Sequence, residues 1–248
     1  MKICYLSNSA IPSSVASSIQ IVKMCEAFSE LKNEVTLITT NVKKINHNIF
    51  NFYKVKKKFT IKRMKKYTTF PLGISYYFFS FFSILESLKY KPDLYITRNF
   101  FTCFLLVLFK KKIIIELHHD ISIESRIVKL LIKYFDFLNS KHIKKAIAIT
   151  DGVKKEYINK KFINDDKIVV LPSGSSLKQK KEIPIKKKSF KIGYFGSLYK
   201  SRGLELIKKL ASIDKNNQYF LYGNLENLKY LKYKNLIKNL HFSNYIPY

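Results

Sequence analysis

The sequence has 248 residues, enough for one large domain or two small ones, and 47% of them are hydrophobic, which supplies ample material for a buried core. This content excludes a disordered chain, and the longest apolar stretches fall far short of the roughly 20 residues that a membrane span needs. The formal charge of +29 suits nucleic acid, an anionic membrane surface or a polyanionic substrate, although AT-rich coding would give the same abundance of Lys, Ile and Asn without selection for charge.

Short β-branched runs alternate with longer amphipathic segments over the first 171 residues. The runs that predict strands lie at 3–6, 34–39, 93–97, 112–117, 146–150 and 167–171. The segments that predict helices lie at 19–31, 74–88, 100–109, 123–138 and 152–160. This alternation is typical of βαβ units, in which helices cover both faces of a parallel sheet.

Two segments interrupt the alternation. Residues 41–67 interleave Lys with aromatic and aliphatic side chains and predict a basic, partly extended excursion. Residues 172–188 have no apolar periodicity, so we expect an interdomain linker there. A new cycle follows, with strands expected at 191–195, 218–222 and 240–242. The loop at 196–203 is expected to open a helix that runs to residue 211, and a second helix is expected at 225–233.

Because a Rossmann-like half needs about five or six strands, the second cycle is unfinished. We therefore predict an α/β fold with one complete Rossmann-like domain over residues 1–177. A linker is expected over 178–189, and the first part of a second Rossmann-like domain over 190–248.

The three cysteines lie far apart among apolar neighbours. Cys4, Cys25 and Cys103 are predicted to be small buried residues in a reducing compartment and not disulfides or metal ligands. The N-terminus runs directly into a strand-like pattern without a cleavable site, so no signal peptide is expected. These features predict a cytoplasmic protein whose membrane contact, if any, is peripheral.

The loop after the strand at 191–195 joins that strand to an amphipathic helix. It begins at Gly196, and Arg202 and Gly203 stand directly before the helix. Backbone N–H groups and a guanidinium therefore meet at a helix N-terminus, which favours an anion such as a phosphate. An ordinary strand-to-helix turn with a solvated Arg would give the same pattern.

This loop resembles the G-[RST]-L-x-x-x-[KR]-G segment of glycosyltransferase family 4, whose members have two Rossmann-like domains in the GT-B arrangement. The residues that fall on the motif are Gly196, Ser197, Leu198, Arg202 and Gly203. The resemblance implies that Arg202 contacts the diphosphate of a nucleotide-sugar. Ser197 stands where the family often has a second basic residue, and Lys200 is its nearest substitute.

The resemblance covers nearly the whole chain. The segments that carry it are MKICYLSN, ELKNEVTLIT, KPDLYITRN, IIIELHHD, AIAITDGVKKEYI, KIVVLPSGSS and HFSNYIPY. It implies that His118, two residues after the Glu of IIIELHHD, lines the cleft beside the transferred sugar. A slip of one residue in the alignment would give that place to His119.

The loop between the first strand and the first helix, residues 7–18, contains the serines Ser13, Ser14, Ser17 and Ser18. In one interpretation they cap the helix and present N–H groups to an anion of the donor or the acceptor. In the other they form only an N-cap and a loop. The family commonly has Gly-Gly where this chain has Val15 and Ala16. Arg98 follows the strand at 93–97, so it either meets the acceptor or is a surface side chain, the usual position of an arginine.

The family resemblance implies glycosyl transfer from a nucleotide-sugar donor to a hydroxyl group of a saccharide or lipid-linked acceptor. The reaction would retain the anomeric configuration, use no metal and no cofactor, and serve surface polysaccharide or glycolipid synthesis. The basic segment that begins at Lys43 and ends at Lys66 would meet an anionic membrane on the inner face of the cell membrane. No nucleic-acid partner is expected, because no recognition motif accompanies the basic residues.

The acidic E-x7-E segment of the family does not occur before the last residue, Tyr248. We therefore expect an incomplete donor site and leave three interpretations open. The sequence is a fragment or split gene product, or a partner chain completes the donor domain, or the protein is a non-catalytic acceptor-domain protein that binds a membrane or a partner.

Overall fold

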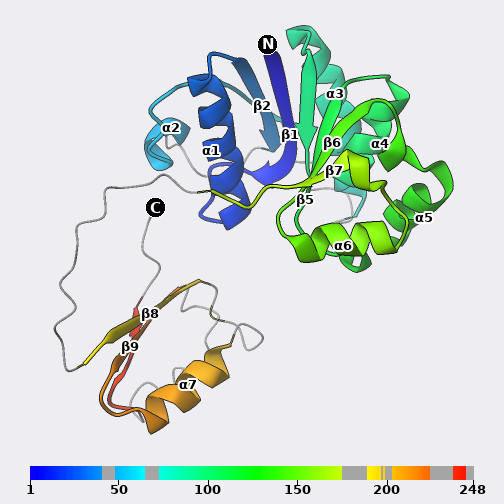
Figure 1. Ribbon diagram of the computed structural model, residues 1–248. Coiled ribbons are helices and arrows are strands. Elements are labelled where there is room, and N and C mark those ends of the chain that lie inside the picture. The colour runs from blue at the N-terminus through cyan, green and yellow to red at the C-terminus, as the bar shows by residue number, and fades with distance from the viewer. Residues whose placement is uncertain are drawn as a thin grey trace. The chain divides into compact units, whose positions relative to one another are not determined.

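A computed structural model describes residues 1–40, 48–64, 73–174, 189–196, 198, 203–223 and 237–243. The chain divides into two compact units, an N-terminal unit of residues Met1–Ser175 and a C-terminal unit of residues Ser176–Tyr248 (Figure 1).

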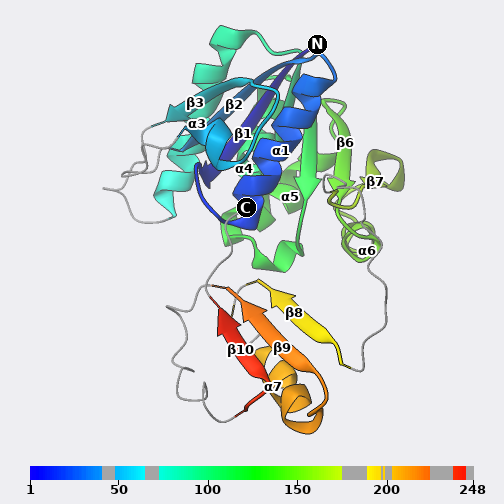
Figure 2. The same ribbon diagram turned by 90° about the vertical axis from the view of Figure 1, so that its left-hand side faces the viewer.

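The N-terminal unit is built on a seven-stranded sheet in the order β3-β2-β1-β4-β5-β6-β7, in which every neighbouring pair is parallel. Figure 2 shows β3, β2 and β1 side by side in this order. The strands are β1 (Lys2–Ala10), β2 (Glu34–Thr40), β3 (Thr60–Met64), β4 (Leu94–Thr97), β5 (Ile113–Leu117), β6 (Ile143–Ala148) and β7 (Ile168–Val170). This arrangement confirms the predicted parallel α/β fold. The strand order reverses between β1 and β4, and such sheets bind ligands beyond the carboxyl ends of the strands at that point.

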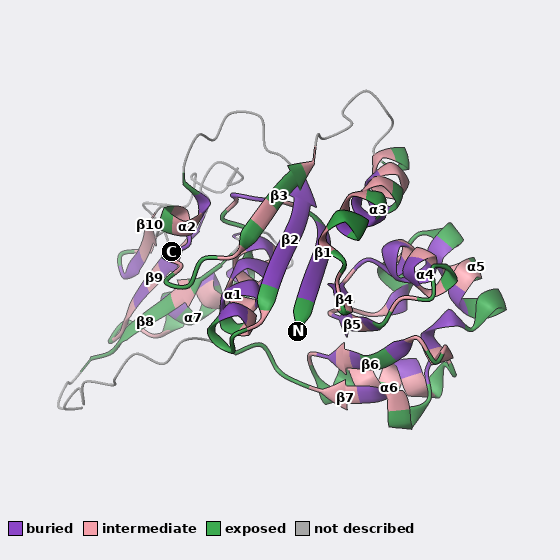
Figure 3. Ribbon diagram, turned by 90° about the horizontal axis from the view of Figure 1, so that it is seen from above, coloured by how far each residue is buried: buried purple, intermediate pink, exposed green. Residues whose placement is uncertain are grey.

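Helices cover both faces of this sheet. They are α1 (Ala16–Glu30), α2 (Ile49–Phe52), α3 (Ile74–Ser87), α4 (Phe100–Leu108), α5 (Arg126–Phe135) and α6 (Asp151–Asn159). Successive residues of a strand point to opposite faces, so Tyr5 packs in the core with α1 whereas Cys4 and Leu6 pack in the core with α3, α4 and α5. Strands β1 and β2 are buried along most of their length (Figure 3).

Three elements differ from the sequence prediction. The basic excursion contains α2 and the edge strand β3, which the prediction missed because the exposed sequence TIKRM lacks an apolar pattern. The helix predicted over 123–138 is shorter, since Asp136 takes a left-handed φ of 45° and ends α5 at Phe135. Strand β6 begins three residues earlier than predicted and includes two lysines.

The three cysteines are free and buried, which confirms the prediction that they act as small apolar residues. Burial raises the pKa of each thiol well above its usual value. Among the described residues no helix is long and apolar enough to cross a membrane.

The C-terminal unit has a parallel sheet in the order β10-β9-β8. Its elements are β8 (Lys191–Phe195), α7 (Leu204–Ile213), β9 (Gln218–Tyr222) and β10 (Leu240–Ser243). A small core joins α7 to the sheet through Leu204, Ala211, Tyr219 and Leu221. The helix predicted at 225–233 and the linker up to 188 lie outside the described residues.

Candidate functional site

A cavity of about 330 Å³ lies in the N-terminal unit beside the point where the strand order reverses. The residues that line it come from the first turns of α1, the end of β4, the start of α4 and the end of β5. They are Ala16, Ser17, Gln20, Arg98, Phe100, Glu116, His118 and His119. The cavity therefore occupies the position where doubly wound sheets bind ligands.

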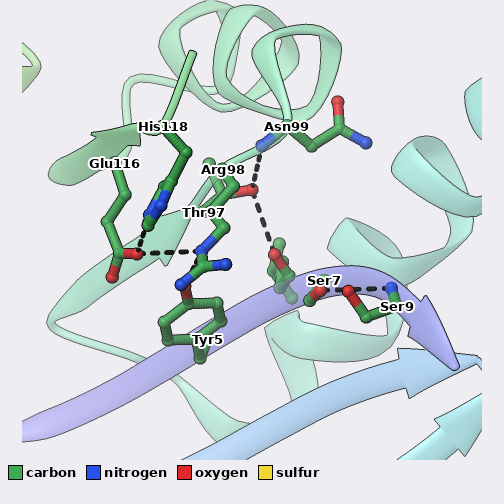
Figure 4. A network of polar contacts seen from close by, with 9 residues as sticks. Tyr5, Ser7, Ser9, Thr97, Arg98, Asn99, Glu116 and His118 are labelled. Atoms are coloured by element: carbon green, nitrogen blue, oxygen red, sulfur yellow. Dashed lines mark hydrogen bonds and ion pairs between the residues drawn. The ribbon is translucent and has the colours of Figure 1, made fainter. Parts of the chain in front are cut away.

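A network of charged and polar side chains joins three neighbouring strands at this cavity (Figure 4). Oε2 of Glu116, on β5, accepts hydrogen bonds from Nε of Arg98 at 2.9 Å and from Nε2 of His118 at 3.0 Å. Arg98 Nε also donates to Oη of Tyr5, on β1, at 3.1 Å. The sheet order β1-β4-β5 brings these residues together although they lie far apart in the sequence.

The carboxyl group of Glu116 is ionised at neutral pH. Burial raises its pKa, but the hydrogen bond from His118 and the positive charge of Arg98 outweigh burial and leave the pKa below its ordinary value. Burial raises the pKa of Tyr5 well above its usual range, and the Glu116 charge adds to this effect, so Tyr5 remains a neutral phenol. The site thus combines a buried carboxylate and a guanidinium.

Two polar atoms of this network have no partner among the described residues. They are Oε1 of Glu116, whose side chain is only 4% exposed, and Nη2 of Arg98. A buried polar group without a partner costs about 1–3 kcal/mol, so a polar ligand that reached these two atoms would relieve that cost. One atom accepts hydrogen bonds and the other donates them, which matches hydroxyl and phosphate groups.

Arg98 is held in place through its backbone. Its neighbour Thr97 donates from Oγ1 to the carbonyl of Leu6 at 3.0 Å, and Asn99 caps α4 by accepting from the N–H of Thr102 at 3.0 Å. The side chain of Arg98 is 17% exposed. The interpretation of Arg98 as an ordinary surface arginine is therefore wrong.

The two histidines of the sequence pair have different surroundings. His118 belongs to the Glu116 network, whereas Nε2 of His119 pairs with Oε1 of Glu124 at 2.8 Å. The hydrogen bond with Glu124 raises the pKa of His119. Both histidines line the cavity, and the implied role of His118 beside a sugar stays a prediction.

None of the loop serines caps α1. The N-cap residue is Val15, and no side chain from the described part of the chain caps the helix, so the predicted serine cap is wrong. Ser13 is instead fixed by Tyr53, whose Oη accepts from the Ser13 N–H and donates to the Ser13 carbonyl, both at 2.7 Å. Ser18 is buried and donates from Oγ to the carbonyl of Ala10 at 3.1 Å.

The absence of a side-chain cap leaves the positive end of α1 available to a ligand. Ala16 and Ser17 form the first turn of this 15-residue helix and line the cavity. Unpaired N–H groups and the helix dipole both favour negative charge at such a position. Ser14, in contrast, is exposed and does not line the cavity.

The predicted phosphate loop of the C-terminal unit is described only in part. Gly196 follows β8, and its N–H donates to the carbonyl of Tyr222 at 3.0 Å. Gly203 precedes α7 with φ 78°, a left-handed conformation that favours glycine. The three other residues of the prediction, Ser197, Lys200 and Arg202, lie outside the described residues.

Gly223, directly after β9, was missed by the sequence analysis. A Cβ atom at this position would lie 2.2 Å from the carbonyl oxygen of Gly196, so the two backbones come together only because Gly223 has no side chain. The single Gly after the apolar run QYFLY was the available signal. Over the described ranges, no three His, Cys, Asp or Glu side chains come together as a metal site.

Residues 18–179, more than half of the chain, match the family described as Glycosyltransferase Family 4. The chain belongs to glycosyltransferase family 4. It is therefore a glycosyltransferase, and the resemblance found in its motifs is confirmed. No curated protein matches the sequence.

Three solved structures illustrate the similarity, and each covers 99% of this chain at 13% sequence identity. HepE from Anabaena, in complex with UDP and glucose, has a TM-score of 0.68 over 70% of its length. Sucrose-phosphate synthase from Thermosynechococcus elongatus has a TM-score of 0.70 over 71% of its length. WaaG, a glycosyltransferase of lipopolysaccharide biosynthesis, has a TM-score of 0.61 over 70% of its length. The fold of this family 4 chain is the GT-B fold.

Proposed function

We propose that this family 4 protein transfers a glycosyl group from a nucleotide-sugar to a hydroxyl group of a saccharide or lipid-linked acceptor. The observation that carries the proposal is the cavity at the carboxyl ends of β4 and β5. It is lined by the first turn of α1 and by Arg98 and Glu116, each of which has one polar atom without a partner among the described residues. Retention of configuration and independence of metal ions follow the family resemblance. We place the reaction in the cytoplasm, in polysaccharide or glycolipid synthesis.

The positive groups of the cavity suit the diphosphate of the donor. The first turn of α1 offers backbone N–H groups, and Arg98 offers a guanidinium that already binds a carboxylate and retains a free nitrogen. A glycosyl transfer leaves negative charge on the departing diphosphate, and donors that are already oriented toward that charge lower the barrier. As the motif implies, Arg202 is proposed to contact the diphosphate of the donor.

The carboxylate and imidazole of the cavity suit the sugar. Oε1 of Glu116 accepts hydrogen bonds, and a sugar hydroxyl is the donor that would satisfy it without adding charge. His118 is anchored by Glu116 through Nε2, which fixes its ring beside the cavity. A ring held in this way positions the transferred sugar, and positioning alone contributes strongly to rate.

The identity of the donor is proposed from similar proteins. HepE was crystallised with UDP and with UDP-glucose, and WaaG acts in lipopolysaccharide biosynthesis. A uridine diphosphate sugar is therefore the first donor to test. Calorimetric titration of the full chain with UDP, UDP-glucose and GDP compares the nucleotides, and release of UDP in the presence of saccharide or lipid-linked acceptors measures transfer.

A pair of histidine variants tests the site. We expect His118→Ala to lower the rate of transfer by at least about tenfold because the sugar loses its positioning contact. His142→Ala is the matched control, since His142 is half-buried and directly precedes β6, at the opposite end of the strands. Equal loss in both variants, or a full chain that binds no nucleoside diphosphate, would contradict the proposal.

A further inference from the structure

Helix α5 is apolar over a larger part of its circumference than the core covers. Val128 and Ile132 are buried, but Ile127, Leu130 and Tyr134 are 51%, 52% and 70% exposed. Their spacing of three and four residues places these three side chains on one stripe along the helix. The stripe therefore points away from the core in which Val128 and Ile132 are buried.

The stripe belongs to a concentration of exposed apolar residues. Among the described residues of the N-terminal unit, fifteen large apolar side chains are exposed, and eleven of them lie on α3, α4, α5 and the adjoining turns. Ile123, in the turn before α5, is 72% exposed. A cavity of about 280 Å³, lined by Leu108 of α4 and Phe135 of α5 among others, connects the ends of these two helices. Single exposed apolar residues are ordinary, but such gathering indicates an interaction surface.

Basic side chains follow one edge of the stripe. Arg126, Lys129 and Lys133 lie on α5, whose sequence RIVKLLIKYF contains no acidic residue, and Lys133 Nζ lies 5.6 Å from the ring centre of Tyr134. Three further lysines, residues 110–112, directly follow the exposed end of α4. An apolar stripe bordered by cations is complementary to a surface that is apolar inside and anionic outside.

The basic excursion of residues 41–67 does not expose apolar side chains beside its basic residues in the part that the structure describes. Over the described residues 48–64 its lysines are mostly exposed, yet its aromatic side chains turn inward. Tyr53 is fully buried, and Phe52 and Phe59 pack against the core with α1. The predicted use of these aromatic residues at a membrane surface is therefore not available to the described part of the segment.

We propose that α5, together with Ile123, lies in the interface of an anionic phospholipid bilayer. The stripe of Ile127, Leu130 and Tyr134 enters the boundary between headgroups and acyl chains, and the three basic residues contact the headgroups. Glu124, next to Ile123, pairs with His119 of the functional cavity. The lipid surface therefore meets the protein beside the cavity, where a lipid-linked acceptor would be presented.

A tryptophan reporter tests the apolar contact. The chain contains no Trp, so Tyr134→Trp places a single indole on the stripe, and Leu31→Trp places a matched one at an exposed site directly after α1, away from α5. With vesicles that contain phosphatidylglycerol, we expect the emission of Tyr134→Trp to shift to shorter wavelength and that of Leu31→Trp to stay unchanged. No shift, or an equal shift in both proteins, would overturn the proposal.

Flotation of the full chain with vesicles tests the charge and the stripe. We expect Arg126→Glu/Lys133→Glu and Ile127→Ser/Leu130→Ser each to lower the partition coefficient for anionic vesicles by at least roughly tenfold. Lys56→Glu/Lys57→Glu makes the same charge change in the basic excursion and should retain most of the binding. Circular dichroism verifies that each variant is folded.

Three results would contradict the membrane proposal. The first is equal binding to neutral and anionic vesicles. The second is a loss of binding in Lys56→Glu/Lys57→Glu as large as the loss in Arg126→Glu/Lys133→Glu. The third is a dimer in light scattering that Ile127→Ser/Leu130→Ser dissociates while vesicles bind none of the proteins, because the stripe would then contact a second copy of the chain.

Discussion

Replacement of Glu116 by Gln should destabilise the N-terminal unit, because it leaves the guanidinium of Arg98 without its carboxylate. Glu116 is 4% exposed and Arg98 is 17% exposed, so water compensates little of the lost charge. Removing one partner of a buried pair costs about 3–5 kcal/mol. Since the Gln amide oxygen and Tyr5 still accept hydrogen bonds from Arg98, we expect the lower end of that range, about 3 kcal/mol.

Thermal and urea unfolding of the full chain measure this loss. In a unit of about 175 residues each kcal/mol shifts Tm by roughly 2–4 °C, so Glu116→Gln should melt about 6–12 °C lower. The double variant Arg98→Met/Glu116→Gln removes both charges and should recover part of the loss, with a coupling energy above about 1 kcal/mol. A Tm within about 2 °C of the unsubstituted protein, or effects that simply add, would refute the charge-pair argument.

The stability that Glu116 contributes should also depend on pH. The pKa of Glu116 is lowered below its unfolded value of 4.5 despite burial, because His118 and Arg98 stabilise the carboxylate. Its contribution to stability is therefore present above pH 4.5 and is lost as the pH falls through the folded pKa. As the pH falls from 4.5 to the folded pKa of Glu116, the Glu116→Gln variant should therefore lose less stability than the unsubstituted protein.

Three further predictions concern other parts of the chain. Gly223→Ala should destabilise the C-terminal unit by about 1–3 kcal/mol, because the added Cβ atom has no room. Gly73→Ala should be neutral or slightly stabilising, because Gly73 has a helical backbone and no atom lies within 4 Å of an added Cβ. Urea unfolding compares the two variants. Tyr53→Phe removes two hydrogen bonds to the backbone of Ser13 and should cost about 1–3 kcal/mol in urea unfolding and weaken UDP binding in calorimetry. The hydrogen bond with Glu124 raises the pKa of His119. The small contribution of this pair to stability is therefore present below pH 6.5 and is lost as the pH rises through the folded pKa. Over that pH range, the Tm of His119→Gln should change less with pH than the Tm of the unsubstituted protein.

The strands and helices that carry an apolar pattern could be predicted from the sequence, because burial on both sheet faces demands such a pattern. The run KIIIEL predicted β5, and burial on both faces of the sheet explains why this run is continuous. Strand β3 has the sequence TIKRM and lies at the sheet edge, where one side of the backbone meets solvent and lysines are favoured. Its pairing with β2 depends on the neighbouring strand and not on its own residues.

The candidate site was predictable only where a single segment defines it. The position of His118 at the end of a buried strand followed from the sequence, whereas its contact with Arg98 through Glu116 did not. Arg98 and Glu116 are separated by a whole helix, and they meet because β4 and β5 are neighbours in the sheet. A Glu inside an apolar strand was the available signal, since burial of a carboxylate requires a cationic partner. The uncapped start of α1 had no signal, because the serines suggested a cap.

The role of Glu116 extends beyond stability, because it determines which atoms of Arg98 remain for a ligand. Glu116 and Tyr5 both accept from Nε, which turns this edge of the guanidinium toward the sheet and leaves Nη2 without a partner. An arginine free to rotate would have to be ordered by the ligand, at a cost of side-chain entropy on each binding event. Since the pair holds Arg98 before the ligand arrives, Glu116→Gln should weaken diphosphate binding even at temperatures where the variant remains folded. Stability and affinity measured on the same variant therefore separate the structural effect of the carboxylate from its effect on the orientation of Arg98.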